Sequence, residues 1–378
     1  MGGWKGTFQS VVGFDDRGWD PADVRRKLGH DADAGVLHGI RFMDGTPVPT
    51  GHVDLPSLKE LREANPSNEV AGQAVLHHMS AMSDSGAPGI QYELDNIESD
   101  ERVMVQMASQ FNLLEMADQW KTPEHGVAVY ASDNTQGPWV CSRTIAGAMY
   151  RNYLMPVDGG LGQSSKEGRS INTTAELMAW LSHLSKDAGH GSISGIYMNG
   201  YLDFSDEDMR GLRWVMRQVS ASEGLWNEAT GLLRVGIHRG APLNGPEGVD
   251  PVHAGASVDL VMSAAFPLAY SRHRRTMENM DALATFSRLV LEATYEATIR
   301  LLCLQQEPTR LLLTSVGGGV FGNEEAWIND AIASALKRTC GLLGEHSVWL
   351  NHHGVSKADD RIRALEREGI ITGHREFL

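Results

Sequence analysis

The chain has 378 residues, of which 42% are hydrophobic, and a net charge of −15, which predicts a globular protein with one large domain or two ordinary ones. The acidic balance excludes broad binding to nucleic acid or to anionic membranes, because both need a basic surface. The sequence contains no apolar run of transmembrane length and no signal-peptide pattern. Its three widely spaced cysteines, Cys141, Cys303 and Cys340, indicate reduced thiols, so we expect a cytoplasmic protein.

Residues 1–100 are rich in glycine, aspartate and proline. One helix is predicted there, over residues 55–64, because Ser57 is a good N-cap and apolar residues follow at helical spacing. The apolar content is thin for an independent core. We therefore predict an N-terminal extension that packs on a main domain, residues 101–378, with an insertion in that domain at about 157–275.

Strand and helix patterns alternate from residue 101 onward. Apolar runs bounded by polar breaks predict strands, and apolar residues three and four apart predict helices. The expected strands are residues 103–111, 127–130, 192–204, 232–238, 258–270, 311–314 and 347–350, the last of these at a sheet edge. The expected helices are residues 139–153, with Pro138 in the first turn, 172–184, 205–220, 277–302, 324–343 and 359–368. This alternation predicts a three-layer α/β fold, in which a mixed, largely parallel sheet has helices on both faces.

A glycine-rich stretch follows the predicted strand at residues 311–314. Glycine allows backbone angles and close approaches that a side chain forbids, and here the glycines stand directly before a helix. Backbone amides at a helix N-terminus bind anions, so the stretch predicts a cradle for a diphosphate; a tight turn without a ligand is the alternative. The candidate ligand-binding residues are Ser315, Gly317, Gly318, Gly319, Val320, Phe321, Gly322 and Asn323.

A second polar cluster follows the strand at residues 103–111. Asn112 stands at the strand end, and Thr135, Gln136, Gly137 and Pro138 stand at a helix start. These last residues either contact a ligand or merely cap the helix. Because ligands of parallel sheets bind where strand carboxyl ends meet helix N-termini, we expect the two helix starts to face one cleft that holds a nucleotide diphosphate.

The order of the motifs ASQFN (residues 108–112), TQGP (135–138), YRNY (150–153), YEAT (295–298) and LLLTSVGGGVFGN (311–323) resembles the macrodomain superfamily, nearest its poly(ADP-ribose) glycohydrolase branch. The resemblance covers residues 103–156 and 295–350. It implies that Asn112 contacts the distal ribose, that the TQGP residues hold the reacting sugar, and that the late glycine loop wraps the diphosphate. It also implies a macrodomain-like fold.

The chain departs from the glycohydrolase pattern in one place. The glycine-rich catalytic loop with consecutive glutamates is absent, and residues 133–138 read DNTQGP where those acids would fall. A carboxylate could come from Glu115, Glu124 or Asp133, although each of these can equally be a solvated loop charge. In the first hypothesis the protein is an ADP-ribosyl hydrolase, in which Asn112 and Gln136 position the ribose or water and Glu115 or Asp133 assists.

In the second hypothesis the protein is a non-catalytic sensor of ADP-ribose or a related nucleotide. Both hypotheses expect ADP-ribose or an ADP-ribosylated macromolecule as the partner, and no cofactor. Trp120 either stacks on adenine or belongs to the core. A third hypothesis, a histidine-metal hydrolase, rests on His238, His253 and the pair His352-His353, but no HExxH or HxH motif accompanies them, so we expect no metal.

Overall fold

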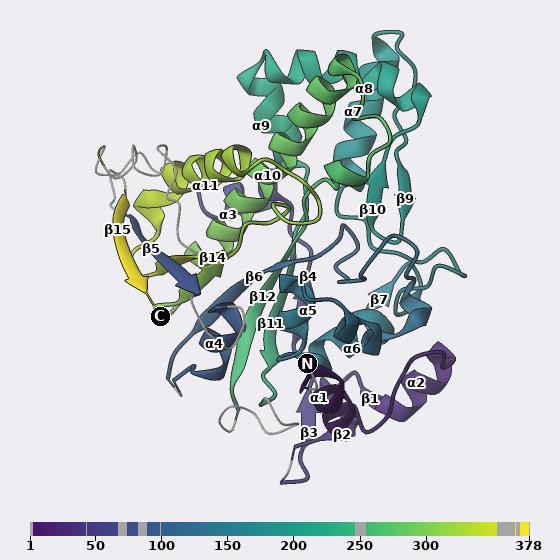
Figure 1. Ribbon diagram of the computed structural model, residues 1–378, viewed down its shortest axis with the longest axis vertical. Helices are drawn as coiled ribbons and strands as arrows, with labels where there is room; N and C mark the ends of the chain where they lie inside the picture. Colours follow the sequence, from purple (N-terminus) through teal and green to yellow (C-terminus); the bar gives the residue numbers. More distant parts are fainter. Residues whose placement is uncertain are drawn as a thin grey trace.

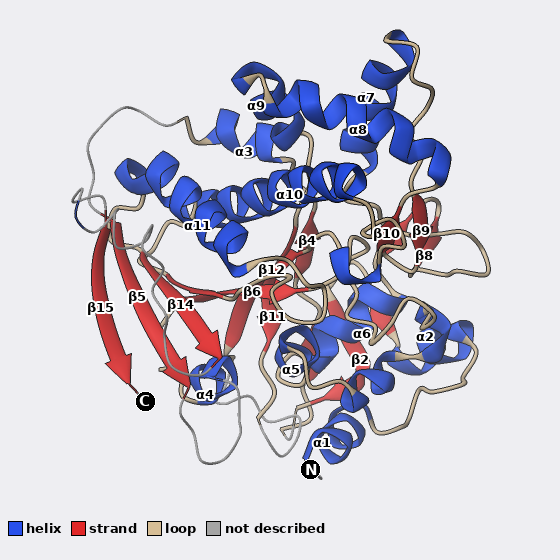
Figure 2. Ribbon diagram, turned by 45° about the horizontal axis from the view of Figure 1, so that its top comes forward, coloured by secondary structure: helices blue, strands red, loops and turns tan. Residues whose placement is uncertain are grey.

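A computed structural model describes residues 3–42, 44–66, 74–81, 89–98, 100–245, 255–353, 367 and 371–377. An eight-stranded sheet crosses the molecule, with helices on both faces (Figures 1 and 2). Its strands are, in chain order, β4 (His52–Asp54), β5 (Ala74–Ala81), β6 (Val103–Ala108), β11 (Gly236–Pro242), β12 (Ser257–Ser263), β13 (Arg310–Leu313), β14 (Ser347–His353) and β15 (Ile371–Phe377).

The strands lie side by side in the order β15-β5-β14-β13-β6-β12-β11-β4. Neighbours from β15 to β12 are parallel, whereas β11 runs antiparallel to both β12 and β4. The strand order therefore brings the carboxyl ends of β13, β6 and β12 together at one edge, where ligands of such sheets bind. The prediction of a mixed, largely parallel sheet is confirmed.

Side chains of the central strands alternate between two hydrophobic cores, as the period of two in a strand requires. Leu311 and Leu313 belong to one core, and Leu312 belongs to the other. The first core packs under the helices α3 (Leu58–Ala64), α7 (Ala175–Asp187), α8 (Asp206–Ser220), α9 (Glu223–Gly231), α10 (Met277–Cys303) and α11 (Glu325–Thr339). The second packs under α1 (Gly3–Val12), α2 (Pro21–Leu28), α4 (Gly89–Asp95), α5 (Gln136–Cys141) and α6 (Ile145–Tyr153). The predicted three layers are thus present (Figure 2).

The fold also contains shorter elements. A small sheet is formed by β1 (His30–Asp31), β2 (Val36–Arg41) and β3 (Pro47–Pro49), and two hairpins by β7 (Pro156–Val157) with β8 (Gly160–Leu161) and by β9 (Ile196–Met198) with β10 (Tyr201–Asp203). The 3-10 helices are η1 (Pro123–His125), η2 (Val127–Ser132), η3 (Leu268–Tyr270) and η4 (Cys340–Leu342).

The first hundred residues form part of the central sheet. They supply β4 and β5 to the central sheet, where β5 lies between β15 and β14. They also supply Asp16, whose buried carboxylate accepts hydrogen bonds from the amides of Val127 (2.7 Å) and Ala128 (2.9 Å) and from the hydroxyl of Tyr153 (2.9 Å). Burial raises the pKa of Asp16. These bonds explain why the strand predicted at residues 127–130 is wrong: the anchored amides form the 3-10 helix η2.

Several helix predictions are confirmed. The helix predicted at residues 55–64 begins at Leu58 with a capping box from Ser57 and Glu60, and α8 and α10 match the predictions for 205–220 and 277–302 closely. The single helix predicted at residues 139–153 is wrong, because α5 and α6 are separated at residues 142–144. There the Ser142 hydroxyl donates to the carbonyl of Trp139 at 2.6 Å, and the break is held open by the side chain of Asn244.

Two strand predictions also need correction. The long strand predicted at residues 192–204 is the hairpin β9–β10, because Asn199 and Gly200 both adopt positive φ and form a tight turn. The strand predicted as an edge at residues 347–350 is the interior strand β14, between β13 and β5. The helix predicted at 359–368 falls outside the described residues except for position 367.

Candidate functional site

The loop after β13 is held from beneath by two side chains. The Tyr295 hydroxyl donates to the carbonyl of Thr314 at 2.6 Å and accepts from the amide of Val316 at 2.9 Å. The side-chain nitrogen of Asn323 donates to the carbonyl of Phe266 at 2.9 Å, which connects the end of the loop to the chain that follows β12. Gly317 has φ +78°, and a Cβ there would lie 2.5 Å from the Cβ of Ala265, so only glycine fits.

Much of the loop backbone remains available to a ligand. Among the described residues, the amides of Ser315, Gly317, Gly319, Val320 and Phe321 have no hydrogen-bond acceptor. Gly319 is exposed, its φ is not positive, and a Cβ there would meet no atom within 4 Å. No contact among the described residues therefore requires glycine at position 319. The loop leads into α11, a 15-residue helix whose positive N-terminal end favours an anion.

The helix start at Gln136 has a different role from the one predicted. β13 pairs with β6 as far as Val105. Beyond that residue, the Gln136 side chain forms hydrogen bonds with the backbone of β6. It accepts from the amide of Ala108 at 2.7 Å and donates to the carbonyl of Gln106 at 3.0 Å. A Cβ at Gly137 would lie 2.0 Å from the carbonyl oxygen of Ala108. Gln136 and Gly137 therefore fasten the six-residue α5 onto β6.

The strand predicted over residues 103–111 ends at Ala108, so the buried Asn112 lies in the turn after β6 and not at the strand end itself. Its side-chain oxygen accepts from the amide of Leu114 at 3.2 Å, and its carbonyl accepts from the side chain of Gln163 at 2.7 Å. The side-chain nitrogen has no hydrogen-bond acceptor among the described residues and is not among the fully buried polar atoms. Asn112 can therefore donate one hydrogen bond to a ligand from a fixed position.

The Glu115 carboxylate lies in the protein interior, which contradicts a direct catalytic role. Its side chain and that of Arg151 are both 0% exposed and are 3.3 Å apart. The same oxygen lies 3.3 Å from the sulfur of Cys141. Burial raises the pKa of Glu115, and the neighbouring Arg151 opposes that shift.

Arg151 also contacts a buried histidine, because it donates to Nδ1 of His238 at 3.3 Å. Burial and the Arg151 charge lower the pKa of His238 to about 3, and its Nε2 donates to the carbonyl of Thr50 at 2.7 Å.

Of the other predicted residues near α5, Asp133 and Thr135 are closer to solvent and Pro138 is not. Asp133 is half-buried and accepts the amide of Thr135 at 2.8 Å, and Thr135 itself is half-buried. Pro138 is buried in the first turn of α5, as predicted. Glu124 lies in η1 and accepts from the hydroxyl of Ser164 at 2.7 Å and from the amide of Lys166 at 3.2 Å. Asp133 is therefore the one candidate carboxylate of the β6–α5 connection that combines solvent access with proximity to α5.

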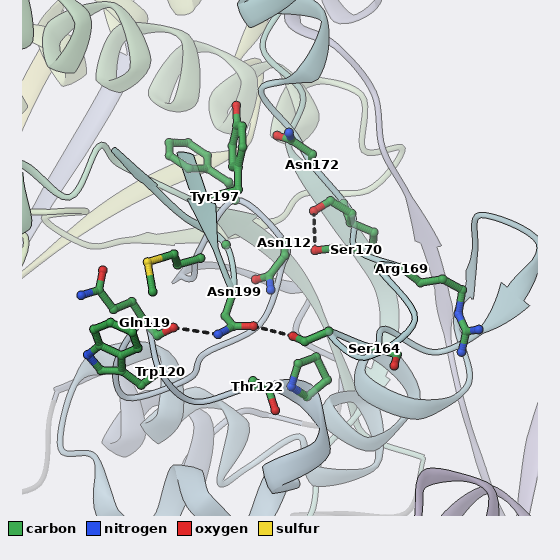
Figure 3. A pocket seen from close by; sticks show the side chains of 17 residues that line it. Asn112, Gln119, Trp120, Thr122, Ser164, Arg169, Ser170, Asn172, Tyr197 and Asn199 are labelled. Carbon is green, nitrogen blue, oxygen red and sulfur yellow. Dashed lines mark hydrogen bonds between the residues drawn. The ribbon is translucent and has the colours of Figure 1, made fainter. Parts of the chain in front are cut away.

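A pocket of about 520 Å³ adjoins Asn112 (Figure 3). Its walls come from the chain after β6, from residues 164–172 and from the turn of the β9–β10 hairpin. Trp120 is 67% exposed at the rim of the pocket, which excludes the alternative that it belongs to the core. Tyr201, directly after the pocket residue Gly200, stacks edge-to-face with Phe321 of the glycine loop at a ring distance of 5.5 Å. The residue that follows the pocket residue Gly200 thus contacts the glycine loop.

Sequence reasoning missed the pocket residues Gln119, Ser164, Asn172 and Asn199. The dipeptide Asn199-Gly200 carried a usable signal, because Asn-Gly between apolar runs is typical of a hairpin turn. The other residues come together only through the fold, since they lie on separate segments.

The metal hypothesis finds no support in the part of the chain that the structure describes, where no three histidine, cysteine or acidic side chains form a metal-binding group. His238 lies in the interior, bonded to Thr50 and Arg151. His253 and the side chains of His352 and His353 lie outside the described part. Among the described residues, no helix is long and apolar enough to span a membrane, and the three cysteines are free thiols.

The fold is that of an α/β protein with a mixed, largely parallel central sheet and loops at the carboxyl edge of its parallel strands. Neither known family profiles nor curated proteins match the sequence. Among solved structures, the chain is similar to poly(ADP-ribose) glycohydrolase from Thermomonospora curvata, with 12% identity and a TM-score of 0.39 over 92% of this chain and 97% of that chain. The same enzyme bound to the inhibitor ADP-HPD gives 12% and 0.38 over the same shares.

Proposed function

We propose that the protein binds the ADP-ribosyl group, with the diphosphate on the loop of residues 314–323. The observation that carries this proposal is the row of backbone amides without acceptors that leads into the N-terminus of α11. Such amides bind phosphate oxygens without a lysine, since the helix end supplies partial positive charge. Asn112, in the turn after the neighbouring strand β6, then offers its side-chain nitrogen to a ribose hydroxyl. The exposed Gly319 lets the diphosphate approach the backbone.

Titration calorimetry with ADP-ribose, AMP and NAD tests this function. We expect micromolar binding that is selective for ADP-ribose. Gly319→Ala should weaken it by about 10-fold or more, because a methyl group would stand where the diphosphate approaches, while the melting temperature stays unchanged. Gly224→Ala is the matched control, since Gly224 lies on the exposed side of α9 with only one side-chain atom near, at 3.8 Å. Absence of binding to all three ligands would refute the proposal.

Hydrolysis of the ADP-ribosyl bond is the second candidate function. The observation that favours it is the open pocket beside Asn112, which leaves room for a leaving group next to the ribose. Hydrolysis adds the hydroxyl of water to the anomeric carbon and the proton to the departing group. Asn112 would position the ribose or water, and Asp133 would be the carboxylate that assists. Gln136 and Glu115 would act indirectly, by holding α5 and the β6 loop in place.

Turnover of ADP-ribosylated substrates separates an enzyme from a sensor. We expect Asp133→Asn to lower kcat while KM and ADP-ribose affinity hold, and Asn112→Ala to lower both kcat and affinity. Asp158→Asn serves as a control carboxylate, because Asp158 lies in the exposed β7–β8 turn. If the native chain binds ADP-ribose and releases no product from any substrate, the protein is a sensor.

A further inference from the structure

The pairing between β13 and β6 stops before either strand ends. β6 pairs with β12 as far as Ala108, and β13 pairs with β14 as far as Leu313. The two strands pair with each other only as far as Leu312 and Val105. The chain after β13 forms the glycine loop, and the chain after β6 leads to Asn112 and α5. Backbone groups that lose a strand partner inside the protein need another one, because leaving them unpaired costs free energy.

Two glutamine side chains supply these partners. On the side of β13, the amide of Thr314 donates to Oε1 of Gln106 at 3.2 Å. On the side of β6, the Gln136 side chain bonds to the amide of Ala108 and to the carbonyl of Gln106. A glutamine side chain combines a donor and an acceptor, as a peptide group does. Gln106 therefore contacts both sides of the separation: its side chain holds the start of the glycine loop, and its carbonyl holds the first residue of α5.

The Gln106 side chain has a fixed orientation. It is 0% exposed, and its Nε2 donates to the hydroxyl of Thr298 at 3.2 Å and lies 3.5 Å from the hydroxyl of Ser263. The Thr298 hydroxyl itself donates to the carbonyl of Thr294 at 2.8 Å, so it accepts from Gln106. The Oε1 atom is thereby directed to Thr314. An apolar side chain at this position would be easier to bury, but it would leave the amide of Thr314 without its acceptor.

Both backbone groups of Thr314 are held by side chains. Its amide donates to Gln106, and its carbonyl accepts from the hydroxyl of Tyr295 at 2.6 Å. Thr314 directly precedes the loop amides that have no acceptor among the described residues, which begin at Ser315. Several amides bind one anion only when they point to the same place. The backbone direction at Thr314 therefore decides where the amides that follow it point.

We propose that Gln106 is a positioning residue of the site, which fixes the glycine loop relative to the start of α5. This inference rests on the proposed function, in which the glycine loop holds the diphosphate and the β6 loop supplies Asn112. Gln106 is buried, so it acts through the amide of Thr314 and the side chain of Gln136. Without its side chain, the glycine loop keeps its glycines but loses one of the two bonds that direct its first amides.

The variant Gln106→Met tests the proposal in the full chain, because methionine has a similar length and no hydrogen-bonding amide. Hydrogen exchange measured by NMR should show the Thr314 amide exchanging about 10-fold faster, the usual effect of one lost hydrogen bond. ADP-ribose should bind about 10-fold more weakly in calorimetry, because an amide that no longer points at the phosphate loses its hydrogen bond. Both measurements are made at a temperature where melting curves show that every variant is folded.

Two further variants control for stability and for folding. Thr230→Val removes a buried hydroxyl on α9 that accepts from Arg62 at 3.2 Å, so it should lower the melting temperature and leave ADP-ribose affinity unchanged. Thr298→Val serves where Gln106→Met does not fold. It removes the partner of Gln106 Nε2 and keeps the acceptor of Thr314, so we expect faster exchange and weaker binding, both by smaller factors than in Gln106→Met.

Two results would overturn the proposal. The first is unchanged exchange of the Thr314 amide in the folded variants. The second is faster exchange together with native ADP-ribose affinity, which would limit Gln106 to holding the fold. Gly319→Ala separates this inference from the proposed function, because it should weaken ADP-ribose binding and leave the exchange of Thr314 unchanged. If the native chain binds no ADP-ribose, the proposed function fails, and faster exchange of Thr314 still shows that Gln106 fixes the loop.

Discussion

Two neighbouring strands of the sheet end in loops that use their polar groups in opposite ways. After β13 the chain is held by Tyr295 and Asn323 from below, and a row of its amides has no acceptor among the described residues. After β6 the polar side chains bond to the protein itself. Gln136 fastens α5 to β6, and Glu115 pairs with Arg151 in the interior. The first loop thus offers its backbone to a ligand, whereas the second uses its side chains to hold the fold.

In the proposed function, this difference allows the two loops to serve one site. A backbone cradle needs fixed geometry and no side chains, so glycine is suitable there. The β6 loop has to place one donor, the side-chain nitrogen of Asn112, beside that cradle. It does so by bonding the oxygen of Asn112 to the amide of Leu114 and its carbonyl to Gln163. Substitutions in the β6 loop should therefore change stability first, and substitutions in the glycine loop should change binding first.

The largest effect is expected from Glu115→Ala. The change leaves Arg151 buried without its carboxylate, and breaking a buried ion pair from one side costs about 3–5 kcal/mol. Chemical denaturation would measure this loss in the free energy of unfolding. The double variant Glu115→Leu/Arg151→Met should recover most of it, since neither charge then remains. If Glu115→Ala is as stable as the native chain and only turnover is lost, Glu115 acts on substrate and our assignment of a positioning role is wrong.

A smaller loss is expected from Gln136→Ala. The variant removes two hydrogen bonds and leaves the amide of Ala108 without its acceptor, which together cost about 2–3 kcal/mol. Hydrogen exchange at α5 should rise as the helix detaches from β6. Gln136→Glu keeps the acceptor for Ala108 but sets a carboxylate oxygen against the carbonyl of Gln106, so it should also be less stable than the native chain. Equal stability of Gln136→Ala and the native chain would place this side chain in the ligand cleft after all.

Acid should weaken the network behind the β6 loop. Burial lowers the pKa of His238 to about 3, whereas an unfolded histidine titrates near 6.5. Between these values the unfolded chain binds more protons, so the stability contributed by neutral His238 is complete above about pH 6.5 and is lost as pH falls toward 3. At pH 5 the loss is about 2 kcal/mol. Denaturation at pH 7 and pH 5 measures it, and His238→Gln should show a smaller difference between the two pH values.

The sequence was informative where the chemistry is local. The loop of residues 317–323 could be predicted because a glycine run between a strand and a helix determines its own backbone, and Ser57 could be predicted as a cap because a cap acts on the next turn. The roles of Glu115 and Gln136 were misread, because their partners, Arg151 and the backbone of β6, come from other parts of the chain. The pocket beside Asn112 could not be predicted for the same reason, because Asn199 joins Gln119 to Ser165 only in the folded protein.

The finest test lies inside the glycine loop, between two alanine variants two residues apart. Gly317→Ala puts a side chain at φ +78° and against Ala265, so it should lower the free energy of unfolding by about 1–2 kcal/mol from the backbone alone. Gly319→Ala meets no protein atom and should change stability by less than about 0.5 kcal/mol. Comparing the two in denaturation and in ADP-ribose titration separates a glycine needed by the fold from a glycine needed by the ligand. If Gly319→Ala alters neither stability nor binding, the ligand does not approach the loop at this residue, and the cradle would have to be formed by the amides at 315 and 317 instead.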